Sequence, residues 1–269
     1  AKQHTPSAVV LDMNLPGYHG LSVLDRLKQD PALRHIPVHV ISVADYTQIA
    51  LSMGAIGYVL KPAKREELER VFRKLEQRLT HRVQRLLIVE ADPEQRKSLR
   101  QLLEGIEVEL SSVGTAAEAL SRLSAQQFDC MVLDLKLPDA SGFELLEKMA
   151  ENDACGFPPV IVYAGRALSA EEEQQLRKFS SSIIVKGARS PERLLDEVTL
   201  FLHQVESVLP PERQRMLLRA RSREALFEGR KILVVEDDVR SIFALSSLLE
   251  PRGAAIVIAR NGREALAVL

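Results

Sequence analysis

The sequence predicts an α/β fold built from doubly wound parallel sheets in tandem units. Residues 9–17, VVLDMNLPG, recur in similar form as residues 131–139, MVLDLKLPD, so the chain contains an internal repeat at an offset of 122 residues. Each copy is a short apolar run that ends in one Asp, followed by Leu-Pro and then by Gly20 or Gly142. Such a run predicts a buried parallel strand with a carboxylate at its carboxyl end, where open α/β sheets bind ligands.

Composition indicates a globular protein with two compact cores, because 46% of the 269 residues are hydrophobic and 27% are charged. The formal net charge of −1 removes the general electrostatic case for a nucleic-acid or anionic-membrane partner, although residues 213–223 form a local basic patch. No apolar run reaches the length of a membrane span and the first residues do not resemble a signal peptide, so we expect a cytoplasmic protein. Cys130 and Cys155 lack metal-ligand spacing and are expected to be buried or incidental thiols.

The first predicted unit covers residues 1–83 and alternates strands with helices. The expected strands are 8–12, 38–42 and 57–61, and the expected helices are about 20–29, 45–53 and 64–80. The last helix carries an apolar stripe between charged faces, as expected for a helix that covers one side of a sheet.

The second predicted unit covers residues 84–206 and is complete, with five strands and five helices in strict alternation. The expected strands are 86–89, 108–110, 130–133, 160–162 and 183–185, and the expected helices begin at residues 93, 115, 141, 169 and 190. Right-handed crossovers make the strand order 2-1-3-4-5 a common solution for such a chain.

A break at residues 209–211, Leu-Pro-Pro, opens a predicted linker over residues 207–229, with a charged connecting helix over 212–227. A third unit covers residues 230–269, and its residues 231–269 match residues 85–123 without a gap at an offset of 146. This unit contains two strand-helix pairs.

The residues at the strand ends form a set: an acidic pair after a first strand, Asp after a third, Ser after a fourth and Lys-Pro after a fifth. This set resembles the receiver domain of two-component response regulators. The resemblance covers nearly the whole chain and implies a flavodoxin-like five-stranded sheet in a complete unit. The order of the units is similar to tandem receivers at the C-terminal end of a hybrid sensor histidine kinase. The first unit here lacks the opening two strands, and the third has only those two.

The two incomplete units are complementary. Glu90 and Asp134 are 44 residues apart in the complete unit, and the path from Glu236 across the joined chain ends to Asp12 is 45 residues. Each half leaves an apolar strand edge unpaired, so we expect the halves to close on one another. Closure within one chain would give a permuted receiver with the second unit inserted, and closure between chains would give a domain-swapped dimer or oligomer. The alternative is an arbitrary fragment with frayed halves.

The resemblance implies a phosphoryl-accepting site in the composite receiver, with Mg²⁺ as cofactor. Asp12 would be the phosphoacceptor. The metal would be held by Asp237, by Asp12 and by the backbone carbonyl of Asn14, while Glu236 would act through metal-bound water. Clustered carboxylates with a cation suit this reaction, because catalysis of phosphoryl transfer is largely positioning and electrostatics. The competing interpretation of Asp12 is a turn carboxylate after a strand.

Three further residues complete this site by resemblance. Lys61 would pair with the phosphoryl oxygens, Ser42 would donate its hydroxyl to one of them, and Tyr58 would change rotamer as Ser42 moves. The readout would be the face formed by the fourth helix, fifth strand and fifth helix of the receiver. Tyr58 is equally well explained as a half-buried strand aromatic.

The second unit keeps Glu90, Asp134 and Lys186 of the receiver pattern. It departs from that pattern at Ala91, Ala164, Ile183 and Gly187. The loss of a metal-ligating carboxylate at residue 91 should weaken Mg²⁺ binding, with Asp92 as the nearby substitute. We therefore expect a pseudo-receiver that acts as a spacer or docking surface.

The chain shows no nucleotide-binding pattern of a kinase core, so its receivers would catalyse only their own phosphorylation and dephosphorylation. His81 and His203 lack the flanking residues of phosphodonor boxes and are expected to be solvated helical histidines. The implied partner is a histidine kinase or a phosphotransfer domain that supplies phosphohistidine. The competing interpretation is a non-phosphorylated interaction scaffold that regulates a histidine kinase.

Overall fold

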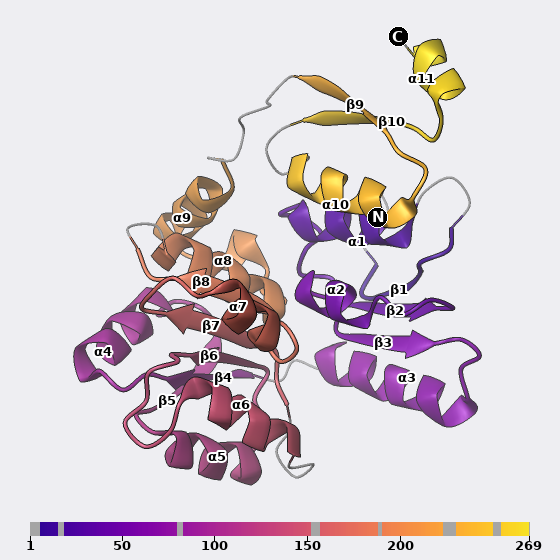
Figure 1. Ribbon diagram of the computed structural model, residues 1–269. Helices are drawn as coiled ribbons and strands as arrows, with labels where there is room; N and C mark the ends of the chain where they lie inside the picture. The colour runs from indigo at the N-terminus through magenta and orange to yellow at the C-terminus, as the bar shows by residue number, and fades with distance from the viewer. Residues whose placement is uncertain are drawn as a thin grey trace.

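The computed structural model describes residues 6–15, 19–79, 83–151, 157–187, 190–222, 230–249 and 254–268. Within these ranges, strands and helices alternate and every strand pair is parallel. The strands form separate sheets of five, three and two strands (Figure 1). The predicted α/β class is therefore confirmed. The search of the described helices finds none with the length and apolarity needed to cross a membrane.

The second unit has the complete sheet. Its strands are β4 (Gln84–Val89), β5 (Val108–Val113), β6 (Cys130–Leu133), β7 (Val160–Ala164) and β8 (Ser182–Val185). Its helices are α4 (Pro93–Leu102), α5 (Ala116–Ala125), α6 (Gly142–Glu151), α7 (Ala170–Leu176) and α8 (Ser190–Phe201). The order β5-β4-β6-β7-β8 is the predicted order 2-1-3-4-5.

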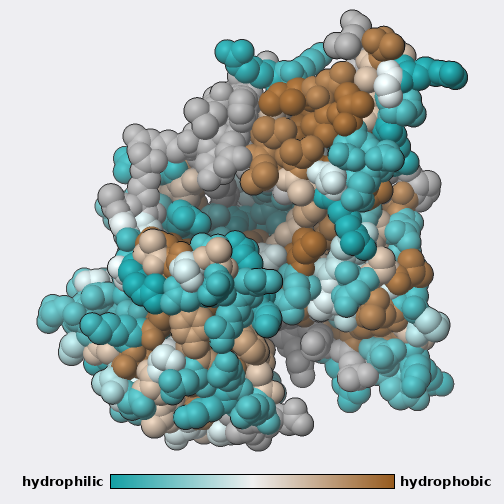
Figure 2. Space-filling view, in the orientation of Figure 1, coloured by the Kyte–Doolittle hydropathy of each residue, from teal (hydrophilic) through white to brown (hydrophobic). Residues whose placement is uncertain are grey.

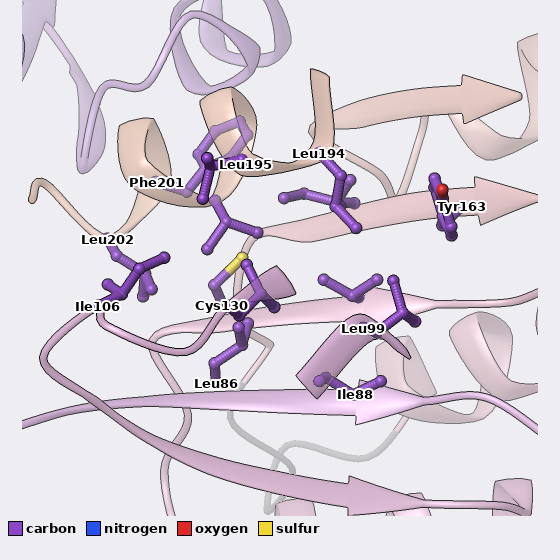
Figure 3. Close-up of a cluster of buried hydrophobic side chains, with 14 of the residues drawn as sticks. Leu86, Ile88, Leu99, Ile106, Cys130, Tyr163, Leu194, Leu195, Phe201 and Leu202 are labelled. Atoms are coloured by element: carbon purple, nitrogen blue, oxygen red, sulfur yellow. The ribbon is translucent and has the colours of Figure 1, made fainter. Parts of the chain in front are cut away.

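Helices cover both faces of this sheet. On one face, α4 and α8 enclose a cluster that includes Leu86, Ile88 and Cys130 (Figure 3). On the other face, α5, α6 and α7 enclose a cluster that includes Leu87 and Val89. Because successive residues of a strand point to opposite faces, the continuous apolar run of β4 is buried on both sides.

The first unit contains a three-stranded sheet. Its strands are β1 (Val9–Asp12), β2 (Val38–Ser42) and β3 (Gly57–Leu60), paired in the order β1-β2-β3. Its helices are α1 (Gly20–Gln29), α2 (Thr47–Ser52) and α3 (Arg65–Leu79). All the predicted elements are present, although α2 begins at Thr47 rather than at residue 45.

The third unit contains β9 (Lys231–Val235) and β10 (Ala255–Ala259), with α10 (Val239–Leu249) and α11 (Gly262–Val268). Among the described strands, β9 pairs with β10 alone and β1 pairs with β2 alone. This structure therefore does not contain the closure of the two halves within one chain, and closure between chains stays a prediction. Instead, α10 contacts α1 and packs Phe243 against the core of the first unit (Figure 1). The physical reason is that α10 is apolar and its own two-stranded sheet is too small to cover it.

The predicted linker is partly built into the second unit. A short 3₁₀ helix, η1 (Glu206–Val208), leads to α9 (Pro211–Ser222), which packs on α8. Leu209 and Leu217 lie in the same buried cluster as α4 and α8, and Arg213 Nη2 donates to the carbonyl oxygen of Gln101 at 2.7 Å. This helix therefore extends the core of the second unit, and it begins at Pro211 rather than at residue 212.

A buried charged contact joins the first and second units. Arg34 is 2% exposed. Its Nη1 donates to Asp196 Oδ1 at 2.5 Å and to Glu206 Oε1 at 3.1 Å. Lys28 is also buried, and its Nζ donates to the carbonyl oxygens of Arg34 and Ile36 at 3.0 and 2.7 Å. Each buried charge therefore has a partner, which offsets the cost of removing it from water.

His203 belongs to this contact, contrary to the expectation of a solvated helical histidine. Helix α8 ends at Phe201, and His203 adopts a positive φ of 50°. Its Nδ1 lies 3.5 Å from Lys28 Nζ. Cys130 is buried, as expected. Pro16, His81 and Cys155 lie outside the described residues.

We expect Arg34→Met to destabilise the contact between the units by about 3–5 kcal/mol, because it leaves the Asp196 and Glu206 carboxylates buried without their cation. Urea unfolding followed by circular dichroism measures the loss. The control is Arg65→Met, which removes an exposed i,i+4 pair with Glu69 and should change little. Equal transitions in the two variants would contradict a buried charged contact.

We also expect a pH dependence to which Glu206 contributes. Burial raises the pKa of Glu206 from 4.5 to about 7. The folded protein then holds a proton that the unfolded chain releases, so this stabilisation is complete below the unfolded pKa and is lost as the pH rises through the folded pKa.

Glu206→Gln should therefore remove a stability loss on the order of 2 kcal/mol between about pH 5 and pH 7 in urea titrations. Burial lowers the pKa of Lys28 to about 7, with repulsion from Arg34 adding to it. That shift has the opposite sign and makes stability rise above pH 7, so it does not mask the effect. An unchanged slope in Glu206→Gln would rule out Glu206 as its origin.

Candidate functional site

The loops after β1 and β6 present a carboxylate in the same way. Asp12 Oδ1 accepts a hydrogen bond from the Asn14 backbone N–H at 3.1 Å. Asp134 Oδ1 accepts one from the Lys136 backbone N–H at 3.1 Å. The repeat seen in the sequence therefore extends to the local hydrogen bonding of each carboxylate.

Glycine is required where the following helix approaches this loop. A Cβ added to Gly20 would lie 2.4 Å from the Asp12 carbonyl oxygen and 2.6 Å from Met13 Cα. A Cβ on Gly142 would lie 2.8 Å from Leu135 Cα. The glycine that follows each Leu-Pro pair thus lets the helix start against the backbone of the Asp loop.

Asp12 and Lys61 form an ion pair at the carboxyl ends of β1 and β3. The Asp12 side chain is 31% exposed, so it is accessible to a partner. The hydrogen bond from Lys61, followed by that from the Asn14 N–H, holds the pKa of Asp12 below its ordinary value. Asp12 is therefore an accessible carboxylate anion at neutral pH.

Ser42 and Tyr58 are linked through the backbone of one residue, Ala44. Ser42 is fully buried, and its Oγ accepts from the Ala44 N–H at 3.2 Å. The Tyr58 hydroxyl donates to the Ala44 carbonyl oxygen and accepts from the Tyr46 N–H at 3.1 Å. A movement of Ser42 would therefore act on the residue that holds the Tyr58 hydroxyl.

The acidic residues of the third unit lie at the carboxyl end of β9, in a different sheet from Asp12. Glu236 Oε1 accepts from the backbone N–H groups of Asp237 and Asp238 at 3.1 and 3.2 Å. In the described part of the chain, no group of three or more His, Cys, Asp or Glu side chains could hold a metal ion. The structure thus brings together Asp12, Asn14, Lys61, Ser42 and Tyr58. It does not bring Glu236 and Asp237 to them.

In the second unit, Lys186 closes the site between two carboxylates. Its Nζ donates to Asp134 Oδ2 at 2.6 Å, to Glu90 Oε2 at 2.8 Å and to Gln95 Oε1 at 2.7 Å. An ammonium group has three N–H donors, so these three acceptors use all of them. Nζ also lies 5.3 Å from the centre of the Tyr163 ring.

The remaining carboxylate oxygens of this site also have donors. Glu90 Oε1 accepts from the Asp92 N–H at 3.1 Å, and Asp134 Oδ1 accepts from Lys136. Asp92, the expected substitute ligand, instead caps the first turn of α4 with its carboxylate. With Ala91 contributing no ligand, Glu90 and Asp134 are the remaining carboxylates at this strand edge, and each has one oxygen bonded to Lys186 and the other to a backbone N–H.

The protonation states follow from the same contacts. Burial raises the pKa of Glu90, and the hydrogen bond from Lys186 opposes that rise. Burial acts to lower the pKa of Lys186, but hydrogen bonds to Asp134 and Glu90 outweigh it and the pKa is raised. The lysine therefore stays cationic at neutral pH.

Sequence reasoning did not identify Gln95, Tyr163 or Ala44 as site residues. Gln95 is in the first turn of α4 and Tyr163 is on β7, so only the packing of α4 and β7 against β8 brings them to Lys186. Ala44 contributes its backbone N–H and carbonyl oxygen, and the identity of a residue does not indicate such a backbone role. The one available signal was that Gln95 follows the Glu90 strand end by five residues.

We expect Lys186→Met and Lys61→Met to differ in stability, although both remove the lysine at the end of the last strand. The side chains of Lys186, Glu90 and Asp134 are 17%, 3% and 11% exposed, so the first variant should cost about 3–5 kcal/mol. The Lys61 and Asp12 side chains are 40% and 31% exposed, so the second should cost at most about 1 kcal/mol. Thermal unfolding compares them, and similar melting temperatures would contradict the closed site.

Comparison with known proteins agrees with this geometry. The family model described as response regulator receiver domain matches residues 1–73 and 86–199. The chain is 36% identical over 74 residues to chemotaxis protein CheY-3 of Vibrio cholerae, a match that covers 25% of this chain and 57% of that protein. It is 37% identical over 70 residues to sensor histidine kinase AtsR of Burkholderia thailandensis, with 26% and 12% covered.

Among solved structures, a CheY-like receiver domain protein from Methanospirillum hungatei aligns with a TM-score of 0.41 and 31% identity. That alignment covers 47% of this chain and 98% of the other. The chain spans less than two thirds of the length of the curated relatives named above. Because the family model matches more than half of the 269 residues, this chain belongs to the response regulator receiver domain family.

Proposed function

We propose that the chain acts in a phosphorelay, with Asp12 as the acceptor of a phosphoryl group from a phosphohistidine. Membership of the receiver family implies two-component signalling. The observation that supports Asp12 is its accessible, ionised carboxylate beside Lys61. The donor would be a histidine kinase or a phosphotransfer domain in the cytoplasm.

The transfer is a displacement at phosphorus. A carboxylate oxygen of Asp12 attacks and forms an O–P bond, while the P–N bond to the donor imidazole breaks. The imidazole nitrogen leaves with the electron pair and takes a proton from solvent. Lys61 supports this reaction, because its ammonium would offset the negative charge of the phosphoryl oxygens beside the carboxylate.

Mg²⁺ would add charge neutralisation between the carboxylates and the phosphoryl group when it is bound. The residues proposed to hold it are Asp12, the backbone carbonyl of Asn14, Asp237 and, through water, Glu236. At the end of β9, the Glu236 carboxylate accepts hydrogen bonds from the backbone N–H groups of Asp237 and Asp238. This donor set fits a divalent cation once it stands beside Asp12.

Signal readout would use Ala44, whose backbone contacts both Ser42 and Tyr58. A phosphoryl group on Asp12 attracts the Ser42 hydroxyl as a donor, which releases the Ala44 N–H from Ser42 Oγ. Tyr58 holds the carbonyl of the same residue, so it responds to the shift. The affected surface comprises α2, β3 and α3, which follow Ser42 in the chain.

We further propose that the second unit is a pseudo-receiver that serves as a spacer or docking surface. Its Lys186 is fully engaged by Glu90, Asp134 and Gln95, and Ala164 offers no hydroxyl for a switch. The same closed site favours the alternative function, a scaffold that regulates a histidine kinase without being phosphorylated. In either case the chain would form part of a larger hybrid kinase.

The test is phosphorylation by acetyl phosphate and Mg²⁺, followed by intact-mass measurement. We expect one phosphoryl group in the wild type, none in Asp12→Asn and wild-type incorporation in Asp134→Asn. The reason is that Asp12 is accessible and pairs with one lysine, whereas Asp134 is buried beside a lysine that also binds Glu90 and Gln95. The two substitutions are matched in size and in their position at a strand end.

Two outcomes would contradict the proposal. Loss of the phosphoryl group in Asp134→Asn alone would move the acceptor to the second unit. Absence of phosphorylation in the wild type, with both acetyl phosphate and phosphoramidate as P–N donor, would favour the scaffold function.

A further inference from the structure

The second unit contains a cavity of about 400 Å³ between α4, α8 and α9, beside the closed lysine site. Pockets that hold small molecules typically measure about 300–1,000 Å³. Tyr163, near the end of β7, and Lys186, directly after β8, both line the cavity, so it lies at the carboxyl edge of the complete sheet. Open α/β sheets bind ligands at this edge. All the described residues that line the cavity belong to the complete unit and to α9.

The walls of this cavity are mainly apolar. Leu99 and Tyr163 are 6% and 8% exposed, and Figure 3 shows both toward the carboxyl ends of the strands. Leu102 and Pro191 line the cavity as well and are half-buried. The Tyr163 hydroxyl is already bonded to Ser190 Oγ at 2.6 Å, so Tyr163 offers an aromatic ring rather than a polar group. These walls favour a ligand with an apolar body.

The charged side chains at the cavity are cations. Lys186 and Arg213 line it, and the described lining residues include no aspartate or glutamate. Arg213 is half-buried. Its Nη2 donates to the carbonyl oxygen of Gln101 at 2.7 Å, and its Nη1 donates to Met216 Sδ at 3.3 Å. A guanidinium group has five N–H donors, so these contacts leave donors for a further acceptor.

Of the two cations, Arg213 is the one that an anion can use. The three N–H groups of Lys186 bind Asp134, Glu90 and Gln95, and the two carboxylates offset its charge. Within the described residues, no carboxylate forms an ion pair with Arg213. A partly buried guanidinium favours a carboxylate partner, which forms charge-assisted hydrogen bonds with it.

We propose that this cavity binds a small organic monocarboxylate, with its carboxylate at Arg213 and its apolar body against Leu99, Leu102 and Tyr163. The charge is limited to one because a second carboxylate would lie among apolar side chains without a cation of its own, which is costly. The inference does not depend on phosphorylation of Asp12.

Binding would act on the position of α9. Arg213 holds this helix to α4 through the Gln101 carbonyl, and the ligand would contact α4, α8 and α9 together. A ligand that binds the folded arrangement stabilises it by mass action. The second unit would then take its input from a small molecule, at a place next to the lysine site that is closed to a phosphoryl group.

Isothermal titration calorimetry of the whole chain with 2-naphthoate as the probe tests the charge. The wild type should show one saturable site. Arg213→Met should weaken binding about tenfold or more, because a hydrogen-bonded charge pair is lost. The control is Arg219→Met on the same helix, since Arg219 is exposed and does not line the cavity. It should bind like the wild type.

The neutral analogue 2-naphthamide separates the charge from the shape of the ligand. The wild type should prefer 2-naphthoate, and Arg213→Met should lose that preference. An unchanged preference in Arg213→Met, or an equal loss of affinity in Arg213→Met and Arg219→Met, would overturn the assignment of the carboxylate to Arg213.

A second pair of variants tests the location, because Figure 2 shows a large hydrophobic surface over β9, β10 and α10 that could also take up an apolar probe. Ser98 and Ser124 are matched. Both are exposed helical serines whose Oγ donates to the carbonyl oxygen four residues earlier at 2.9 Å. Only Ser98 lines the cavity.

Ser98→Phe should abolish binding of 2-naphthoate, because its ring would fill the cavity, and Ser124→Phe should bind like the wild type. Equal binding in the two variants would place the probe elsewhere on the chain and overturn the proposal. Absence of saturable binding to the wild type at millimolar 2-naphthoate would overturn it as well. If Ser98→Phe does not fold, the comparison of Arg213→Met with Arg219→Met decides the question.

Discussion

In the first and second units, the lysine at the end of the last strand is the counter-ion on which the carboxylates at the sheet tip depend. Parallel strands buried on both faces bring their carboxyl ends to one edge, so carboxylates there are close together and partly removed from water. Without a cation they would repel one another and pay the cost of burial. Lys61 and Lys186 supply that cation in the first and second units.

The same backbone arrangement produces two chemically different sites because the lysine binds a different number of acceptors in each. Lys186 binds Asp134, Glu90 and Gln95, and its partners are nearly inaccessible. Lys61 binds Asp12, which is open to solvent. A buried lysine whose three N–H groups are all bonded stabilises the folded structure. An accessible carboxylate beside a single cation would leave room for a phosphoryl group next to that cation.

Sheet pairing imposes the second constraint. A strand at the centre of a parallel sheet needs a neighbour on each side, as β4 and β6 have. β9 and β1 have one each among the described strands; Val10 and Val235 are exposed, whereas Leu11 and Val234 are buried. The position of α10 on α1 buries part of one helix, but it leaves both edges open and separates Asp237 from Asp12. Meanwhile Arg34 joins the first unit to Asp196 of α8 and to Glu206 of η1, so the two units are not independent.

The sequence by itself determined the local features. The apolar runs predicted the strands at 38–42 and 130–133 to the residue, and the strand-end motifs located Asp12, Ser42, Lys61 and Asp134. These features are predictable because strand periodicity, turn chemistry and the glycine after Leu-Pro act over a few residues.

The tertiary structure decided everything that depends on distant residues. Lys186 binds Gln95, which is 91 positions away in the sequence, and Arg34 binds Asp196, which is 162 positions away. The Asp92 carboxylate caps helix α4 and is not in position to act as a metal ligand. The contacts of Lys186 and Arg34 join residues that are far apart in the sequence, so they form only when the helices and strands pack against one another.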